Sequence, residues 1–379
     1  MKEDVCIANK NSPLATYCSS LNQARLCIKL PERNKIIFVN VATNEKNLEP
    51  TNQVLPRIAI TMGDAAGIGA EIVLKALADE NLKQICSPVI IGDISFLRKT
   101  SKESDLESDF VEADEKFQTA VNQIAVYNLN NLTEEIVLGE DSAIAGKAAV
   151  EYIETAVQLW RKGKIDAIAT APISKKAIQM GGYDFPGHTE FLAYLTDTKE
   201  FAMSFFAENL RVVLLSTHVS LRDAINLVKK ERLVELIKFS HREISKLLKR
   251  EAKIAVAGLN PHASEGGMFG AEEKDEIIPA ITECREKFGI DVSGAFSPDT
   301  IFLRGFKGEF DGVVSCYHDQ ATIAVKCLSF GASVNVTLGL PLVRTSVDHG
   351  TAFDIAGKNL ADASSMKAAI KLAAKLASG

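Results

Sequence analysis

Apolar and polar residues alternate along most of this chain in two different periods. From Arg57 onward, short apolar runs such as Ile58–Met62 and Val212–Ser216 are each followed by a longer stretch with helical spacing, such as Ala143–Lys162. Short strands that alternate with helices of this length predict parallel sheets with helices on both faces. We therefore expect an α/β fold in which most strands are parallel.

The same alternation continues to the end of the chain, but no repeat or low-complexity linker marks a domain boundary. A length of 379 residues suits two domains better than one. We predict a first α/β/α domain from residues 55–172 plus 335–379 and a second from residues 173–334. Further strands are predicted at Val89–Ile91, Ile124–Tyr127, Ala167–Thr170, Ile254–Gly258, Val313–Ser315 and Val334–Leu338, and further helices at Glu71–Leu77, Arg232–Arg250, Glu272–Lys287 and Ser364–Leu376.

Residues 1–54 differ from the rest of the chain. They are rich in Asn and Lys, and they show no sustained helical or strand period apart from the apolar run Ile36–Val39. We expect them to form a poorly ordered N-terminal extension outside the chemistry.

Composition and charge narrow the class of protein. Hydrophobic residues make up 46% of the chain and charged residues 24%, which is ordinary for a globular enzyme, and the formal net charge of −6 gives no global reason to bind nucleic acid or an anionic membrane. The seven cysteines are odd in number and form no CxxC pair, which excludes a complete set of disulfides and the common zinc ribbons. Without a membrane-length apolar run or a secretory signal, a cytoplasmic location is expected.

Three of the six histidines follow apolar runs at the expected strand ends. These are His218, His262 and His318. The carboxyl ends of parallel strands collect ligands at one edge of a sheet, and three neutral imidazoles suit a divalent metal such as Zn²⁺, Co²⁺ or Mn²⁺. The alternative is that each histidine belongs to a separate loop and makes its own hydrogen bonds.

Two motifs at predicted helix starts allow a structural and a functional interpretation. The loop Gly63–Gly69 has the spacing GxxxGxG, which is neither the Rossmann nor the Walker A pattern, so it is either a tight turn or a phosphate contact. In the segment Pro186–Glu190, Thr189 is either a helix N-cap or, with His188, a donor to an anionic group.

The last third of the chain holds the densest set of polar residues. Lys326 is the only basic residue in an apolar helix, Asn335 lies inside a predicted strand, and Arg344 lies in a polar loop. A buried hydrogen bond explains an Asn inside a strand, and a Lys on a helix can extend its long side chain to water. Lys, Arg and Asn together, however, fit a phosphate or carboxylate better. Asp319 and Asp348 each neighbour a histidine, so either is a candidate to orient an imidazole. The residues alone thus predict a two-domain α/β metalloenzyme that acts on a small, phosphorylated anion.

At these motifs the sequence resembles the 4-hydroxythreonine-4-phosphate dehydrogenase family of vitamin B6 biosynthesis. The resemblance runs from about Arg57 to the end of the chain, with the motifs in family order. It implies a homodimer with an isocitrate/isopropylmalate-dehydrogenase-like fold and an active site in the interdomain cleft, at the subunit interface. The motifs that carry it are Ile60–Gly69, Phe185–Glu190, Thr217–Asp223, Gly258–His262, Tyr317–Gln320 and Val334–Gly357.

The resemblance also assigns roles to individual positions. It places metal ligands at His218, His262 and His318, the last from the partner subunit, for a Zn²⁺, Mg²⁺ or Co²⁺ ion. It implies NAD or NADP as the second cofactor, with no residue assigned to it. The substrate contacts that it implies are His188, Thr189, Lys326, Asn335 and Arg344.

The implied reaction is the NAD(P)-linked oxidation of the 3-hydroxyl of 4-phosphooxy-L-threonine, followed by decarboxylation to 3-amino-2-oxopropyl phosphate, in pyridoxal 5'-phosphate biosynthesis. Within the same family, the alternative is a dehydrogenase of 4-phosphoerythronate or 4-phosphothreonate in sugar-acid catabolism. Two alternatives from other classes are a hydrolase or lyase that uses the three histidines to activate water, and a non-catalytic binding protein.

Overall fold

The computed structural model describes residues 16–18, 25–29, 36–40, 55–106, 108–113, 123–329 and 332–378. The chain divides into two compact units, Met1–Val54 and Leu55–Gly379. In the first unit, β1 (Thr16–Cys18), β2 (Arg25–Lys29) and β3 (Ile36–Asn40) form an antiparallel sheet in that order. These strands did not follow from the sequence pattern, which singled out only the apolar run within β3. The predicted poor order of residues 1–54 concerns mainly positions outside the described residues.

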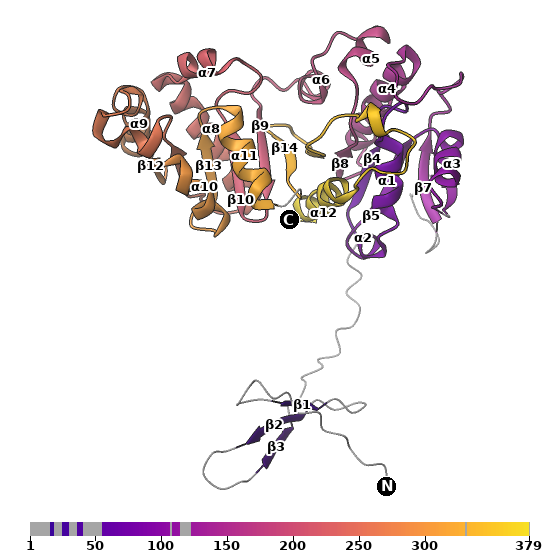
Figure 1. The fold of residues 1–379 in the computed structure, drawn as a ribbon, viewed down its shortest axis with the longest axis horizontal. Helices are drawn as coiled ribbons and strands as arrows, with labels where there is room; N and C mark the ends of the chain where they lie inside the picture. Colours follow the sequence, from indigo (N-terminus) through magenta and orange to yellow (C-terminus); the bar gives the residue numbers. More distant parts are fainter. Residues whose placement is uncertain are drawn as a thin grey trace. The chain divides into compact units, whose positions relative to one another are not determined.

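The second unit is built on one 12-stranded sheet with the order β12-β11-β13-β10-β9-β14-β15-β8-β4-β5-β7-β6 (Figure 1). The mostly parallel α/β architecture that the sequence predicts is confirmed. The strands are β4 (Arg57–Thr61), β5 (Ser87–Gly92), β6 (Asp109–Glu112), β7 (Gln123–Asn128), β8 (Ala167–Thr170), β9 (Ala202–Ala207), β10 (Leu210–Leu214), β11 (Ile254–Ala257), β12 (Val292–Phe296), β13 (Gly312–Ser315), β14 (Val334–Leu338) and β15 (Val343–Ser346).

The direction of the strands reverses in the middle of this sheet. The pairs β10–β9, β9–β14 and β14–β15 are antiparallel, whereas the pairs on either side of them are parallel. Two parallel blocks that run in opposite directions are therefore joined through β9 and β14. The sheet is continuous across the predicted domain boundaries, and the division into domains 55–172 plus 335–379 and 173–334 stays a prediction.

Helices cover both parallel blocks. One block is surrounded by helices from the first half of the second unit, and the other by helices from its second half. Figure 1 shows α1–α5 around the block that contains β4 and β8, and α7–α11 around the block that contains β10 and β13, with α12 beside the central strands. The helices are α1 (Gly69–Leu77), α2 (Glu80–Ile85), α3 (Ile94–Glu103), α4 (Ala143–Arg161), α5 (Lys175–Met180), α6 (His188–Leu195), α7 (Leu221–Leu227), α8 (Lys230–Leu248), α9 (Ile278–Phe288), α10 (Pro298–Phe306), α11 (His318–Ser329) and α12 (Ser364–Ser378).

Burial explains why the apolar runs become strands. Every residue of β8 is buried, and so is every residue of β4 after Arg57, because helices cover both faces of the sheet there. The apolar core around these strands extends into α4 and α12. Two further apolar clusters lie around β10, β11 and β13, one packed against α8 and α9 and the other against α10 and α11. In the part of the chain that the structure describes, no helix has the length and hydropathy of a membrane span.

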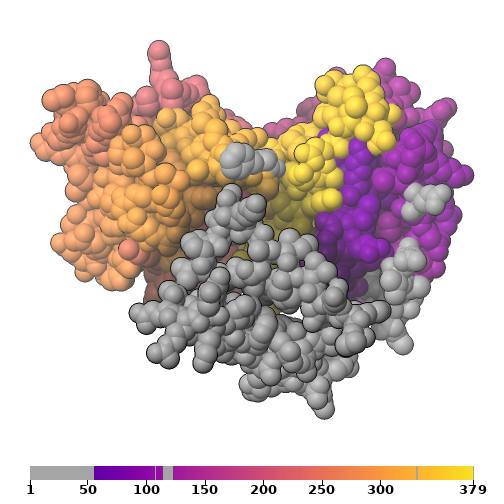
Figure 2. All heavy atoms as spheres, turned by 60° about the horizontal axis from the view of Figure 1, so that its bottom comes forward, coloured from indigo at the N-terminus to yellow at the C-terminus, as the bar shows by residue number. Residues whose placement is uncertain are grey.

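The surface is hollowed between the two sides of the second unit. Figure 2 shows this hollow between the part coloured orange, where α8–α11 lie in the sequence, and the yellow C-terminal segment. The cavity described next is lined mostly by residues between 172 and 218 and between 335 and 350, together with His318.

Candidate functional site

A cavity of about 380 Å³, which we call the central pocket, lies over the antiparallel centre of the sheet. Its floor is one face of three strands, because Asn335 of β14 pairs with Phe205 of β9 on one side and with Ser346 of β15 on the other. Loops that follow strands of both parallel blocks complete its walls. Its lining is Pro172, Ile173, Lys175, Pro186–Glu190, Met203, Phe205, His218, His318, Asn335, Arg344 and Ser346–Gly350.

Arg344 is a buried cation at the floor of the central pocket, and its side chain is only 2% exposed. Its guanidinium donates hydrogen bonds to the hydroxyl groups of Thr170 and Thr337 at 2.8–3.2 Å. Burial lowers the pKa of Arg344 to about 9, so it is still charged at neutral pH. Among the described residues no carboxylate forms an ion pair with Arg344. A buried charge without a counterion is costly, and an anionic ligand in the pocket would compensate it.

Three polar atoms of the pocket lining, in addition to the charge of Arg344, lack a partner: they are buried and form no hydrogen bond. They are Nε2 of His188, Oδ1 of Asn335 and Nε2 of His349. Burial lowers the pKa of His188 well below its usual value, and the charge of Arg344 lowers it further, so this ring is neutral. Buried polar atoms are nearly always satisfied in native proteins, so a polar ligand is expected here.

Thr189 does not cap the helix that the sequence predicts after it. Gly187 is the N-cap residue of α6, and it makes no side-chain capping bond. Thr189 lies inside the first turn and is buried, with its hydroxyl 3.4 Å from that of Thr337. Of the two interpretations of this motif, the structure thus contradicts the N-cap and places both His188 and Thr189 on the pocket.

Two of the three histidines at strand ends converge in the central pocket. The rings of His218 and His318 lie 5.6 Å apart between centroids. Burial, and then the charges of Lys175 and His318, lower the pKa of His218, which favours the neutral imidazole that binds metals. Nδ1 of His318 lies 2.7 Å from the carboxylate of Asp319, which leaves Nε2 as the ring nitrogen available to a ligand.

The third histidine, His262, does not join them. It is exposed on the turn η1 (Pro261–Gly267) and does not line the central pocket, although β11, which precedes it, lies beside β13 in the sheet. Within residues 55–106, 108–113, 123–329 and 332–378, no group of three or more His, Cys, Asp or Glu side chains is arranged to hold a metal ion. Imidazole nitrogens fit a divalent metal by chemistry, but the described part of the single chain brings only His218 and His318 together. The resemblance assigns His318 to the partner subunit, but within one chain His318 already lies beside His218, and His262 is the histidine that stands apart. Which histidine a partner subunit contributes stays a prediction.

Lys326 and Asp348 lie together beside the central pocket. Both line a cavity of about 230 Å³ with His318 and Phe205, and Nζ of Lys326 is 3.7 Å from the Asp348 carboxylate. The hydroxyls of Ser333 and Ser365 also donate to that carboxylate. Asp348 therefore positions Lys326 and contacts no imidazole in the described part of the chain, which differs from the role that its sequence neighbour His349 suggested. Asp319 does contact its neighbour His318.

The glycine loop Gly63–Gly69 packs against the chain rather than lining the pocket. The backbone N–H of Asp64 donates to Pro172, and the Asp64 carboxylate accepts from the N–H of Ala66. A Cβ on Gly67 would lie 2.8 Å from the carbonyl oxygen of Thr351. Of the two interpretations of this loop, the structure supports the tight turn.

Sequence reasoning missed two charged residues of the central pocket. Lys175 lies in the loop and helix that follow β8, so the strand-end rule that selected the histidines also points to it. Glu190 lies inside the motif Pro186–Glu190 but was not singled out. Both side chains are exposed.

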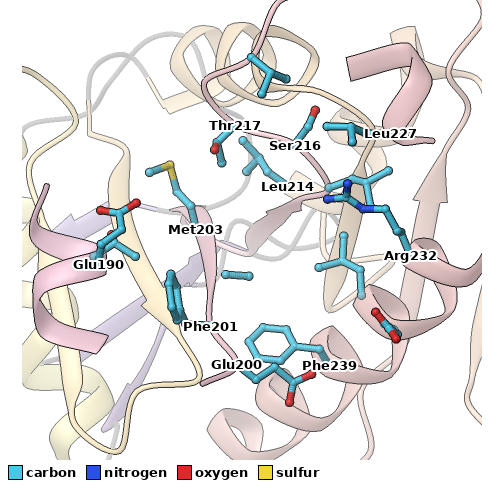
Figure 3. Close-up of a pocket in the computed structure, with 16 residues that line it drawn as sticks. Glu190, Glu200, Phe201, Met203, Leu214, Ser216, Thr217, Leu227, Arg232 and Phe239 are labelled. Atoms are coloured by element: carbon cyan, nitrogen blue, oxygen red, sulfur yellow. The ribbon is translucent and has the colours of Figure 1, made fainter. Parts of the chain in front are cut away.

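A second cavity of about 400 Å³ adjoins the central pocket and shares Thr189, Glu190 and Met203 with it. Figure 3 shows its mostly apolar wall, with Leu214, Leu227 and Phe239, and the guanidinium of Arg232 that points into it.

Comparison with known proteins places the chain in a family. The family model described as "Pyridoxal phosphate biosynthetic protein PdxA" matches residues 84–373. The chain belongs to the PdxA family. The family resemblance seen in the sequence motifs is thereby confirmed.

Close relatives of this PdxA-family chain are named as dehydrogenases. The D-threonate 4-phosphate dehydrogenase of Cupriavidus necator is 45% identical over 326 residues, which are 85% of this chain and 98% of that protein. Crystal structures titled 4-hydroxythreonine-4-phosphate dehydrogenase from Burkholderia phymatum (44% identity, TM-score 0.75) and Klebsiella pneumoniae (39% identity, TM-score 0.78) each match 85% of this chain and 98% and 99% of their own chains. These PdxA-family relatives are oxidoreductases by name, and their structures share this fold.

Proposed function

We propose that this PdxA-family protein is a metal-dependent, NAD(P)-linked dehydrogenase of a four-carbon hydroxy acid that is phosphorylated at C4. The observation that carries the proposal is the buried guanidinium of Arg344, which has no ion pair in the described residues and lies in the same pocket as the neighbouring imidazoles of His218 and His318. An anion anchor beside a pair of metal-type ligands suits an acidic substrate with a hydroxyl group at its centre.

D-Threonate 4-phosphate is the first candidate substrate. The relative from Cupriavidus necator, 45% identical, carries this substrate in its name. Oxidation at C3 of this acid gives a β-keto acid, which loses C1 as CO₂ and takes up a proton at C2, so that the product is dihydroxyacetone phosphate. Cations are available for both anionic ends of such a molecule, because Arg344 lies in the central pocket and Lys326 lies in the cavity beside it.

4-Phosphooxy-L-threonine, the substrate that the motifs first suggested, is the second candidate. The names of the structures from Burkholderia phymatum and Klebsiella pneumoniae favour it. It differs in an ammonium group at C2, which needs a carboxylate in the pocket. Glu190 lines the central pocket and forms no ion pair in the described residues, so it is the candidate partner of that ammonium.

The chain's own residues bind and orient the substrate. Arg344, His188, Thr189, Asn335 and Lys326 hold the acidic and polar groups, and the neutral ring of His188 acts as a hydrogen-bond partner rather than a charge. A substrate held at both ends presents its C3 hydroxyl to the centre of the pocket in one orientation.

We propose His218 and His318 as metal ligands, with Asp319 fixing the ring of His318. His262 is proposed as the third ligand, contributed within a homodimer because it is exposed in the single chain. When bound, a divalent metal supplies positive charge that acidifies the substrate hydroxyl, and NAD(P)⁺ supplies the hydride acceptor. No residue is assigned to the nicotinamide cofactor.

The proposed homodimer has apolar surface available near these histidines. Val219, Leu221 and Ile225 beside or within α7, and Met268 and Phe269 after η1, are exposed apolar side chains. Exposed apolar groups next to ligand residues mark a candidate interface. We also propose the two-domain division and a cytoplasmic location. Light scattering after size exclusion tests the homodimer, which a monomer at assay concentration would contradict.

The substrate assignment is tested with a panel. Formation of NAD(P)H is followed with D-threonate 4-phosphate, 4-phosphooxy-L-threonine and 4-phosphoerythronate, and the product is identified by mass. The proposal expects the highest kcat/KM with D-threonate 4-phosphate and release of CO₂. A higher kcat/KM with the aminated substrate moves the enzyme to pyridoxal phosphate biosynthesis, and no turnover of any of the three refutes the proposal.

A further inference from the structure

The central pocket and the adjoining cavity that holds Lys326 share Phe205, His318 and Asp348, and the positive charges at the two ends of this combined space differ in how they are compensated. At one end the ammonium of Lys326 has the carboxylate of Asp348 at 3.7 Å. At the other end lie Arg344 and Lys175, neither of which has an ion pair in the part of the chain that the structure describes. A substrate with a singly charged carboxylate and a doubly charged phosphate matches this difference.

Lys175 lies against the start of α6. Its Cε is 3.9 Å from the position that a Cβ would take on Gly187, and its side chain lines the central pocket. It lines the pocket together with His188 and His218. The next residue, Lys176, instead forms an ion pair with Asp141 at 3.2 Å. Two adjacent lysines thus differ in environment.

The start of α6 offers hydrogen-bond donors at the same place. Gly187 makes no side-chain capping bond, and the helix is eight residues long. The first N–H groups of a helix lack partners within the helix and attract anions. The lining residue His188 belongs to this first turn, and its buried Nε2 has no partner.

Arg344 provides independent evidence for an anion here. Three of the five N–H donors of a guanidinium are used on Thr170 and Thr337, which leaves two for a ligand. Arg344 and Thr189 both contact the hydroxyl of Thr337, at 3.1 and 3.4 Å, which places the guanidinium beside the first turn of α6. A 98% buried cation without a counterion is not explained by the helix start alone.

The carboxylate of Glu190 lies in the same turn and acts on both Arg344 and His218. Figure 3 shows its side chain beside Met203, in the adjoining cavity. It forms no ion pair with Lys175 or Arg344 among the described residues, so hydrogen-bond donors of both cations stay available to a ligand.

We propose that Lys175, Arg344 and the first turn of α6 form the phosphate subsite, and that the Lys326 end takes the carboxylate of the substrate. Lys175 is the residue that this inference adds. The assignment deepens the proposed function and rests on it for the identity of the substrate, but not for the binding of phosphate.

Inorganic phosphate is the probe that tests the subsite without turnover. Its binding is measured by titration calorimetry and by the rise in Tm, at constant ionic strength set with chloride. Half-saturation of the variant Lys175→Met should require at least about tenfold more phosphate than half-saturation of the wild type, because a charge-assisted hydrogen bond is lost. The control Lys176→Met should bind phosphate like the wild type. No binding by the wild type, or equal binding by Lys175→Met, overturns the subsite.

A second measurement distinguishes the phosphate end from the carboxylate end. With Lys175→Met, kcat/KM should fall about tenfold or more for D-threonate 4-phosphate, but not for unphosphorylated D-threonate at high concentration. An equal fall in kcat/KM for both substrates would mean that Lys175 contacts a part of the substrate other than the phosphate, and it would refute the phosphate role. If neither wild-type activity is found, the proposed dehydrogenase function fails while the phosphate titration still decides the subsite.

Discussion

Nδ1 of His318 lies 2.7 Å from Oδ1 of Asp319, and the two residues open helix α11 at the wall of the central pocket. A carboxylate at this position fixes the ring and leaves Nε2 for a metal ion. The same pocket holds His218, and its floor holds Arg344. Two of the proposed metal ligands and the proposed anion anchor therefore lie within one cavity, and each proposed role has its own test.

Replacement of Asp319 by Asn should weaken metal binding while the fold is kept. The pair is partly exposed, so the expected effect is on the orientation and basicity of His318 rather than on stability. The concentration of Zn²⁺ or Co²⁺ that restores half of the activity after chelation should rise about tenfold or more. Asp299→Asn, at the exposed start of α10, is the control, and an equal metal requirement in both variants would contradict the role.

Replacement of Arg344 by Lys should raise KM more than it lowers kcat. Lys lacks the planar fork that bonds Thr170 and Thr337 and also faces the pocket. KM for the phosphorylated substrate should increase about 10-fold to 100-fold. Arg211→Lys, which changes an arginine of β10 bonded to the carbonyls of Asn209 and Asp311, should leave KM unchanged. An unaltered KM in Arg344→Lys would remove the anchor role.

Gly146 in α4 allows the close approach of α5, which carries Lys175. A Cβ at this position would overlap the backbone of Ala177. Gly146→Ala should lower the free energy of unfolding by about 1–3 kcal/mol and weaken phosphate binding through displacement of α5. A Cβ on Gly163 would meet no atom within 4 Å, but the backbone there has a φ of +63°, which an alanine adopts less readily. Gly163→Ala should therefore lower the free energy of unfolding by about 1 kcal/mol and leave phosphate binding unchanged. Urea denaturation and calorimetry check both, and unchanged phosphate affinity in Gly146→Ala contradicts the coupling.

Asp64 should make stability fall as pH rises. Burial raises its pKa from 3.8 to about 6, and its Oδ2 has no partner. The folded state therefore binds the proton more tightly than the unfolded state, and this contribution is present below pH 3.8 and is lost as pH rises through about 6. The free energy of unfolding of Asp64→Asn, relative to wild type, should increase by about 3 kcal/mol between acidic and neutral pH.

Asp79 should change the stability with pH in the opposite direction, and it serves as the control for Asp64. Its bonds to Asn81 lower its pKa, so the stability that it contributes is present above pH 3.8 and is lost as pH falls. Asp79→Asn should therefore lose stability relative to wild type as pH rises from acid. Urea titrations across this range measure both differences, and a pH-independent difference for Asp64→Asn would contradict its raised pKa.

Much of the fold follows from the sequence because buried strands leave a clear local pattern. Apolar runs predicted at Ile58–Met62, Ala167–Thr170, Val212–Ser216 and Val313–Ser315 overlap β4, β8, β10 and β13. β15 was not predicted, since Arg344, Thr345 and Ser346 are polar, and their burial depends on the neighbouring strands and α12. The reversal of direction at β9 and β14 also lies outside local pattern, because hydrophobicity does not encode which way a strand runs.

The candidate site was predicted in part for a similar reason. Residue type and the family motifs pointed to Arg344, His218 and His318, which the structure brings to one pocket. The rule that ligands gather beyond strand ends did not foresee a floor made by the faces of antiparallel strands. Spatial partners are equally invisible to sequence spacing: Asp348 lies beside His349 in the chain but contacts Lys326.

The most direct test of the account is the formation of NAD(P)H from D-threonate 4-phosphate by the wild type and by His318→Ala, each after chelation and then with added Zn²⁺ or Co²⁺. The account predicts that chelation abolishes wild-type activity, that the metal restores it, and that His318→Ala stays inactive in all conditions. Full activity in the presence of chelator, or in His318→Ala, would contradict a metal-dependent dehydrogenase site at this pocket.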